Sequence, residues 1–239
     1  MREHVTNAFK NSLIDLSFKE RVLEPESMEE TAEDYAGMDF AESNKAFIDL
    51  MSPMIPENSQ VVDFGCGPGD IAVILAKARP DLKITGVDIS QSMLKIAEQK
   101  ARGEGAGNKL SWQIGDITWP ILAKGKIDFA YSHTTLHHLK KIMPFFYQVD
   151  RALRPQGGFC IRDLRRPRSA IEAIKWIYEA TGNKLTQRQY ELFFYSLRAS
   201  LTLPEIRKEL IGTVIQGKLE ASKNPKRYWV LYKTALPQV

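Results

Sequence analysis

Short apolar runs alternate with amphipathic stretches through the middle of the chain. The runs are short, and most of them hold β-branched and aromatic side chains, which is typical of buried strands. The stretches between them repeat apolar residues every three or four positions, as amphipathic helices do. We therefore predict strands at 61–64, 83–87, 110–113, 127–131 and 158–161, and helices at 69–78, 90–102 and 140–153.

The segments on either side of this alternating region have helical spacing. Residues 1–58 carry apolar positions at helical intervals until Pro53 and Pro56 interrupt them, and we expect a helical lid there. Residues 166–203 combine helical periodicity with a high content of aromatic side chains. They predict a pair of helices inserted after the fifth strand.

The last part of the chain predicts two further strands. In residues 204–239 a short helix is followed by apolar runs at 213–215 and 228–232, joined by the turn-prone segment 222–225. Strands that alternate with helices specify a parallel sheet covered on both faces. The predicted fold is therefore α/β, a doubly wound, seven-stranded, mostly parallel sheet with helices on both faces and a C-terminal antiparallel hairpin.

Length and composition fit one domain. The 239 residues contain no internal repeat, low-complexity tract or linker, so we expect a single domain over residues 1–239. The two cysteines have no paired spacing, which argues against a disulfide framework. No apolar run is long enough to cross a bilayer, and the first residues lack the apolar core of a signal peptide. We expect a cytoplasmic protein without membrane contact.

One glycine-rich turn carries the strongest chemical signal. The predicted strand 61–64 runs into Gly65-Cys66-Gly67-Pro68-Gly69, and the turn opens a predicted helix. Glycine lets the backbone approach a ligand closely, and the start of a helix offers unpaired N–H groups. The second strand ends at Asp88, where a carboxylate can accept hydrogen bonds from both hydroxyls of a ribose. These features predict a nucleotide-like ligand.

The spacing of the glycines separates two classes of nucleotide. Nicotinamide and flavin sites favour G-x-G-x-x-G, whereas this chain has G-x-G-x-G with Asp63 two residues before the first glycine. A carboxylate there is a poor neighbour for a pyrophosphate. It is a good neighbour for the ammonium or sulfonium group of S-adenosylmethionine, which carries no phosphate.

Together these motifs resemble the class I S-adenosylmethionine-dependent methyltransferases, over roughly residues 44–165. The later patterns Tyr131-Ser132-His133-Thr134-Thr135-Leu136-His137-His138-Leu139 and Leu153-Arg154-Pro155-Gln156-Gly157-Gly158 also look like that family. The resemblance implies a cofactor-binding core at 59–165. It implies that S-adenosylmethionine is the cofactor and that the glycine loop, the acid after strand two and the acid after strand three hold its methionine part, ribose and adenine. The implied cofactor contacts are Asp63, Gly65, Cys66, Gly67, Gly69, Asp88, Ile89, Met93, Asp116, Ile117 and Ser132.

Several of these residues have a second, structural interpretation. Asp88 can cap the next helix and Asp116 can close a turn before Pro120, and neither role conflicts with ligand binding. Met93 and Ile117 are equally consistent with core positions. A weaker similarity of the N-terminal segment to small-molecule methyltransferases makes Tyr35 a candidate cover for the cofactor, although packing on the surface would explain it equally.

The predicted catalytic residues follow strands four and five. His133 lies at the carboxyl edge of the sheet and is the first candidate for a base, because imidazole titrates near neutral pH. Asp163 can act as a base, neutralise Arg162 or cap a turn. His133 and His137 are four residues apart, but no acid or thiol nearby completes a metal site, so we predict no metal. We expect His137 to contact the acceptor.

A basic segment begins where the fifth strand ends. Arg162 and Arg165 can hold a carboxylate or phosphate of the acceptor by paired hydrogen bonds, and a solvated basic loop would show the same pattern. Arg198 in the inserted helices can reach over the same site. Aromatic residues in the insertion favour a planar acceptor, and they are equally consistent with a core.

The predicted activity is methyl transfer from S-adenosylmethionine to a small-molecule acceptor, anionic or aromatic, by in-line displacement. The arginine cluster and a pI near 8.9 favour RNA or protein as the acceptor instead, although no nucleic-acid-binding module is present in the sequence. The sequence is also compatible with a protein that binds the cofactor without turnover and with a nicotinamide dehydrogenase. It leaves a homodimer open.

Overall fold

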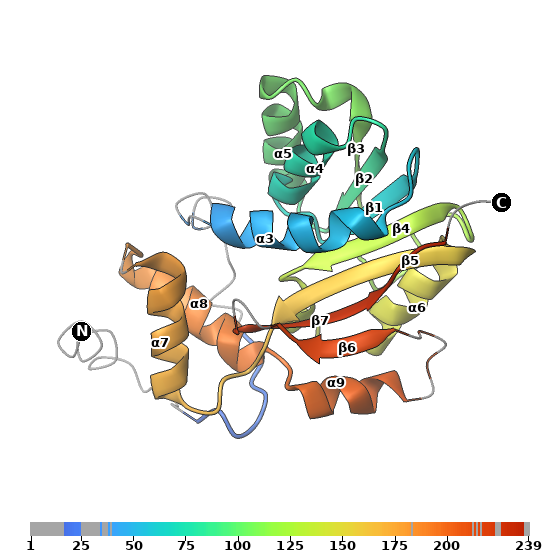
Figure 1. Cartoon of the computed structure of the whole chain (residues 1–239). Coiled ribbons are helices and arrows are strands. Elements are labelled where there is room, and N and C mark those ends of the chain that lie inside the picture. The colour runs from blue at the N-terminus through green and yellow to red at the C-terminus, as the bar shows by residue number, and fades with distance from the viewer. Residues whose placement is uncertain are drawn as a thin grey trace.

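The computed structural model describes residues 17–24, 34, 38, 40–182, 184–211, 213, 215, 217–222 and 226–236. These residues form a seven-stranded sheet with the order β3-β2-β1-β4-β5-β7-β6 (Figure 1). β7 runs antiparallel to both β5 and β6, and the other neighbouring strands are parallel. The strands are β1 (Gln60–Phe64), β2 (Lys83–Asp88), β3 (Leu110–Ile114), β4 (Ile127–His133), β5 (Leu153–Leu164), β6 (Lys218–Ala221) and β7 (Tyr228–Lys233). The predicted fold class is confirmed.

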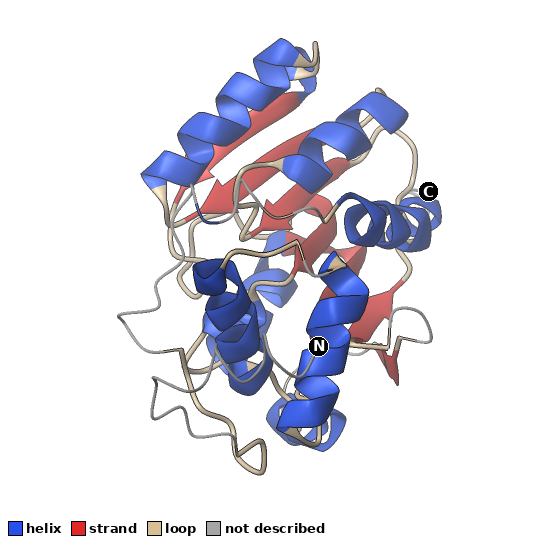
Figure 2. Cartoon of the chain, turned by 90° about the vertical axis from the view of Figure 1, so that its left-hand side faces the viewer, coloured by secondary structure: helices blue, strands red, loops and turns tan. Residues whose placement is uncertain are grey.

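Helices cover both faces of the sheet, as Figure 2 shows in a view turned by 90°. On one face, α3 and α4 pack together and α4 contacts α5; on the other face lie α6 and α9. The helices are α3 (Ala41–Met51), α4 (Asp70–Ala78), α5 (Gln91–Gly103), α6 (Met143–Ala152), α7 (Ala170–Thr181), α8 (Gln187–Ala199) and α9 (Leu203–Leu210), with short 3-10 turns η2 (Ser52–Met54), η3 (Gly107–Lys109) and η4 (Leu136–His138). No helix in this described part is long and apolar enough to cross a membrane.

Consecutive residues of the central strands are buried on opposite faces of the sheet. Val61 of β1 belongs to the core under α3 and α4, whereas Val62 and Phe64 belong to the core under α6. β4 is buried along its whole length. Because side chains of a strand alternate between faces, a strand buried on both sides is mostly apolar, and this is why the central strands show as short apolar runs in the sequence.

The inserted helices α7 and α8 stand beyond the carboxyl ends of β4 and β5, next to the start of α3 (Figure 1). They enclose a third apolar cluster that includes Phe18, Leu164, Trp176 and Phe194. α8 begins with a capping box, in which Thr186 and Gln189 exchange side-chain and backbone hydrogen bonds. Much of the aromatic content of the insertion therefore serves this cluster. Within the predicted lid at 1–58, the structure describes residues 17–24, 34, 38 and 40–58, which include α3 and η2.

The first strand of the C-terminal hairpin differs from the prediction. Residues 213 and 215 lie outside any strand, and β6 is instead formed by Lys218–Ala221, whose Leu219 pairs with Leu231 of β7. β6 is an edge strand with the sequence Lys-Leu-Glu-Ala. Its charged side chains are typical of edge strands. Because its apolar content is low, the sequence pattern favours the more apolar run at 213–215 over the residues that form the strand.

Gly158 of β5 packs closely against the end of β7 and the residues after it, because a Cβ atom there would lie 2.6 Å from the carbonyl oxygen of Lys233 and against the backbone of Ala235. We expect Gly158→Ala to force the strands apart and to lower the free energy of unfolding by about 1–3 kcal/mol. The matched control is Gly103→Ala at the end of α5, where an added Cβ meets nothing within 4 Å. Urea denaturation measures both, and equal stabilities would show that the strands have room for a side chain.

Candidate functional site

The glycine turn lies at the carboxyl edge of the sheet, between β1 and α4. Gly65, Gly67 and Gly69 have φ values of 73°, 51° and 77°, in the left-handed region that favours glycine. The N–H groups of Gly65 and Cys66 donate to the carbonyl oxygen of Val87, at 2.8 and 3.0 Å, and this fixes the turn to the end of β2.

Asp88 connects the glycine turn to the start of α5. Its Oδ2 accepts the N–H of Gly67 at 2.8 Å, and its Oδ1 accepts the N–H of Ser90, the N-cap residue of α5, at 2.9 Å. Each carboxylate oxygen has a second lone pair, so both can still accept a hydroxyl hydrogen. Structural and ligand-binding roles are therefore compatible at Asp88, as expected from the sequence.

Asp63 is buried beneath the turn, with 3% of its surface exposed. Burial raises the pKa of Asp63 to about 8, although Tyr131 lowers it in part, and the negative charge of Asp88 raises it further. Burial likewise raises the pKa of the Cys66 thiol. A buried carboxyl of this kind has a strong preference for a cationic partner, and the ammonium group of the predicted cofactor would supply one.

The predicted adenine contacts surround the ends of β2 and β3. Ile89 is 70% exposed beside Asp88, whereas Ile117 is buried in the core under α6. Asp116 accepts hydrogen bonds from the N–H and hydroxyl of Thr118, so it closes a turn there. A Cβ atom on Gly67 would meet no protein atom within 4 Å. Open space at Gly67 and the exposed Ile89 fit a nucleoside placed along this edge. Tyr35 lies outside the described residues.

Residues 132–138, which follow β4, run alongside the glycine turn. Ser132 donates to the carbonyl oxygen of Phe64 at 2.8 Å, and the hydroxyl of Thr135 donates to that of Gly65 at 3.2 Å. Any Cβ on Gly65 would lie 2.6 Å from the Thr135 hydroxyl, so glycine is required here for space as well as for φ. Thr134 has a positive φ of 54° where the chain turns away from the strand.

Asp163 holds this segment in place from β5. Its Oδ2 accepts the N–H groups of Thr135 and Leu136 at 2.8 and 2.5 Å, and its Oδ1 contacts Nδ1 of His137 at 2.7 Å and the N–H of Leu164 at 2.6 Å. The residue is 1% exposed. Because four nitrogen atoms of the protein surround the carboxylate, this geometry argues against its predicted role as the base that contacts the acceptor.

His133, the first candidate for a base, lies against a buried arginine. Its Nε2 is 3.0 Å from Nη2 of Arg162, and its ring stacks on Phe47 with centroids 4.8 Å apart. Burial, and then the charge of Arg162, lower the pKa of His133 well below its usual value. Since the guanidinium occupies the lone pair of Nε2, this placement argues against the predicted role of His133 as the base.

The three arginines predicted to bind the acceptor point elsewhere. Arg162 is buried beneath α3, where Nη2 donates to the carbonyl oxygen of Ser43 at 2.5 Å. Arg165 stacks on the ring of Trp176, and Arg198 is buried, with Nε 3.3 Å from the carbonyl oxygen of Ser17. None of them belongs to the described residues that line the pocket beside the glycine turn, and this argues against their predicted role.

Side chains of β5 alternate between the two faces of the sheet. This explains why Arg162 has a structural role although it is next to Asp163 in the sequence. Successive side chains of a strand point to opposite faces of the sheet, so these two charges serve different surfaces. Arg162 faces α3, where it lies between the rings of Phe47 and Tyr228, 4.9 and 4.5 Å from their centroids. Its charge therefore holds α3 against the sheet.

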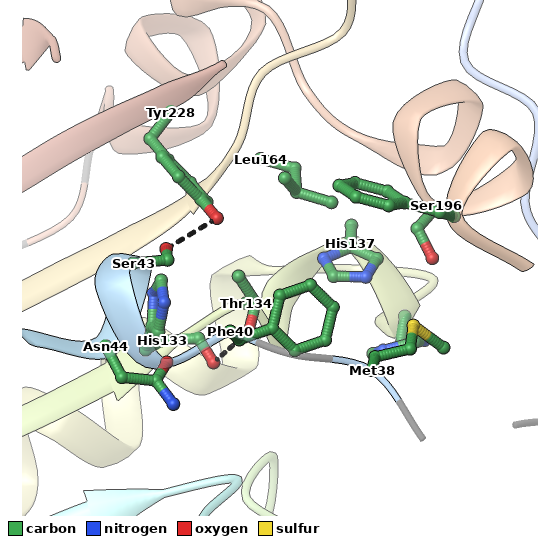
Figure 3. Close-up of a pocket in the computed structure, with 12 residues that line it drawn as sticks. Met38, Phe40, Ser43, Asn44, His133, Thr134, His137, Leu164, Ser196 and Tyr228 are labelled. Atoms are coloured by element: carbon green, nitrogen blue, oxygen red, sulfur yellow. Dashed lines mark hydrogen bonds between the residues drawn. The ribbon is translucent and has the colours of Figure 1, made fainter. Parts of the chain in front are cut away.

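A pocket opens on the far side of segment 132–138 (Figure 3). The side chains come from α3 and the residues before it, the end of β4, η4, the end of β5, α8 and β7. They are Met38, Phe40, Ser43, Asn44, His133, Thr134, His137, His138, Leu164, Phe193, Ser196 and Tyr228. Sequence reasoning finds His133 and His137 among them. It misses the aromatic and amide side chains because no local motif marks them.

The N-terminal segment 17–24 is bonded to residues that line the pocket. Arg21 donates to the carbonyl oxygens of Ala199, His137 and Leu139, and Glu24 accepts the hydroxyl of Ser196 at 2.6 Å. Glu24 also lies 2.5 Å from Nδ1 of His138. Burial would raise the pKa of Glu24, but the hydrogen bond and charge of His138 outweigh it and lower the pKa to about 2.

Glu24, His137 and His138 also raise the question of a metal, since one ligand atom of each lies within 4.8 Å of the others. Glu24 is too far from these histidines along the chain for spacing to suggest it. Two ligands of one tetrahedral zinc ion stand about 3.3 Å apart, given bonds of about 2.0 Å. Glu24 and His138 are directly hydrogen-bonded at 2.5 Å, so the described arrangement is a carboxylate–imidazole pair with no room for an ion between these two atoms.

Comparison with known proteins identifies relatives of this chain. A family model described as a methyltransferase domain matches residues 55–208, more than half of the chain. A 2-phytyl-1,4-naphtoquinone methyltransferase of Synechococcus elongatus is 28% identical over 148 residues, which cover 59% of this chain and 64% of that protein. A demethylmenaquinone methyltransferase of Porphyromonas gingivalis is 31% identical over 132 residues, covering 55% of this chain and 53% of that protein. The chain thus spans less than two thirds of these relatives.

Solved structures share the fold. A SAM-dependent methyltransferase of Aquifex aeolicus has a TM-score of 0.64 at 16% identity and covers 84% of this chain and 96% of that one. Phosphoethanolamine N-methyltransferase 2 of Haemonchus contortus, solved with S-adenosylmethionine, has a TM-score of 0.56 at 24% identity, over 76% of this chain and 38% of that one. At these identities the likeness establishes the architecture alone.

The open space at Gly67 is testable with a matched pair of variants. Gly67 and Gly182 both have positive φ, of 51° and 57°, and a Cβ atom on either meets nothing within 4 Å. Alanine should therefore cost each site about 1–2 kcal/mol of stability. Only Gly67→Ala should also weaken S-adenosylhomocysteine binding, by about tenfold or more, because its methyl group would occupy ligand space. Calorimetric titration measures this, and equal affinities would exclude the ligand from this turn.

The raised pKa of Asp63 predicts that ligand binding is coupled to the release of a proton. With a pKa of about 8, its carboxyl keeps its proton at pH 7 in the ligand-free protein, and a bound ammonium group favours the ionised form. Binding of S-adenosylhomocysteine at pH 7 should therefore release about one proton. Calorimetry in two buffers of different ionisation enthalpy gives the number. Asp63→Asn should bind with lower affinity and without this release; an unchanged release would place the proton elsewhere.

Proposed function

Because this chain belongs to the methyltransferase domain family, we propose that it transfers a methyl group from S-adenosylmethionine to a small, planar and largely apolar acceptor. The observation that carries the proposal is the position of segment 132–138. One side of it contacts the end of β1 through Ser132 and the glycine turn through Thr135, and Thr134 and His137 line the pocket. A cofactor at the turn and an acceptor in the pocket would then both lie against this one segment.

The residues of the turn fit S-adenosylmethionine. Asp63 would pair with its ammonium group, Asp88 would accept the ribose hydroxyls, and Ile89 and Asp116 would lie along the adenine. When bound, the cofactor supplies a methyl group made electrophilic by the sulfonium. The protein then has to orient the acceptor, exclude water and provide a place for any proton that leaves.

The pocket lining favours a neutral aromatic acceptor. Phe40, Phe193 and Leu164 line it, and histidines are the only ionisable groups besides Tyr228 among its described lining residues. Flat aromatic side chains suit a planar ring, and an anionic acceptor would need a cation that these residues do not supply. The relatives named for naphtoquinone and menaquinone chemistry support this acceptor class.

Calorimetric titration tests the cofactor assignment. We expect saturable binding of S-adenosylmethionine and S-adenosylhomocysteine and none of NAD. Asp88→Ala should weaken that binding by about 2 kcal/mol, roughly 30-fold, because two ribose hydrogen bonds are lost. Asp49→Ala, at an exposed carboxylate of α3 paired with Lys45, is the matched control and should bind normally. Binding of NAD alone would overturn the proposal.

A further inference from the structure

We propose that Nε2 of His137 is the proton acceptor of the reaction, and that the acceptor molecule carries its reacting hydroxyl on an aromatic ring. This inference rests on the proposed methyltransferase function and specifies the chemistry of its pocket. It assigns the role of the base to His137 instead of His133. Asp163 becomes a positioning residue that acts through His137.

Asp163 determines which nitrogen of His137 can accept a proton. The carboxylate receives three backbone N–H groups, from Thr135, Leu136 and Leu164, so both of its oxygens already act as hydrogen-bond acceptors. Its contact with His137 Nδ1 at 2.7 Å therefore requires the hydrogen on Nδ1. The neutral ring then carries its lone pair on Nε2, in the tautomer that a general base needs.

His137 also has the right position among the three histidines of the pocket. The lone pair of His133 Nε2 faces the Arg162 guanidinium at 3.0 Å, and His138 is joined to Glu24 through Nδ1. His137 lines the pocket and lies two residues beyond Thr135, whose hydroxyl contacts the glycine turn (Figure 3). The buried carboxylate of Asp163 orients the ring of His137. His137 also lies on segment 132–138, which contacts the glycine turn and lines the pocket.

The acidity that a histidine base favours, together with the lining of the pocket, indicates which kind of hydroxyl the acceptor carries. Imidazole has an ordinary pKa of about 6.5, and a phenolic hydroxyl one of about 10, so proton transfer between them is accessible as the oxygen attacks. An aliphatic hydroxyl is a much weaker acid than a phenolic one, so a phenolic hydroxyl suits this base better. Phe40 and Phe193 line the same pocket and suit the faces of an aromatic ring. Base and lining therefore agree on a hydroxylated aromatic acceptor.

The step balances in atoms and charge. The hydroxyl proton moves to Nε2 of His137 while an electron pair of the acceptor oxygen forms the new bond to the methyl carbon. The electron pair of the carbon–sulfur bond remains on sulfur, so the positive charge passes from the sulfonium to the imidazolium. Asp163 stabilises that imidazolium through Nδ1–H, and the ring later releases its proton to water.

The test uses the full chain, S-adenosylmethionine and two acceptors with the same ring, 1-naphthol and the more acidic 4-nitro-1-naphthol. We expect His137→Ala to lower kcat for 1-naphthol by about 100-fold or more, and to lower it much less for the nitro compound, which ionises without help. Added imidazole should restore part of the 1-naphthol activity of His137→Ala. His138→Ala is the matched control from the same turn, and imidazole should not rescue it.

The contrary outcomes distinguish failure of this inference from failure of the proposed function. Equal losses for both acceptors without imidazole rescue would show that His137 has a structural role, provided that the variant binds S-adenosylhomocysteine as the wild type does. A wild-type enzyme that binds S-adenosylhomocysteine but methylates neither naphthol would overturn the hydroxyl-acceptor inference and leave the cofactor assignment intact. A wild-type protein that does not bind S-adenosylhomocysteine would overturn the proposed function itself.

Discussion

The geometry of both halves of the site depends on one buried carboxylate, that of Asp163. Hydrogen bonds to a charged group are worth about 1.5–3 kcal/mol each, and Asp163 receives two of them from the backbone of Thr135 and Leu136. These bonds hold the chain after β4 in a turn that begins with the positive φ of Thr134. That turn presents Thr135 to the glycine loop and His137 to the pocket. The same carboxylate thus sets the spacing between the predicted cofactor and acceptor.

Most of the arrangement around the glycine turn could be predicted from the sequence because that part of the site is local. The glycine turn, Asp63 and Asp88 follow consecutive strands whose order a regular alternation reveals, and parallel strands bring their carboxyl ends to one edge. The pocket half is not local. Glu24 meets His138 over a separation of 114 residues, and Ser43 meets Tyr228 over 185. No spacing rule links such residues, so the pocket lining could not be predicted.

The choice between His133 and His137 shows the same limit at the scale of one turn. Both follow β4, and four residues of separation would place them on one face of a regular helix. The chain instead leaves the strand through the left-handed Thr134 and forms only the 3-10 turn η4. The two rings then face different partners, His133 the guanidinium of Arg162 and His137 the carboxylate of Asp163.

Two different parts of the chain supply the residues that line the pocket, and this bears on the specificity for the acceptor. His137 and Thr134 belong to the core after β4, whereas Phe40, Phe193 and Ser196 come from the start of α3 and from α8. The groups that would perform the chemistry and those that would select the ring therefore lie on separate segments. Glu24 joins them, because it bonds both Ser196 and His138. This carboxylate therefore links α8 directly to η4.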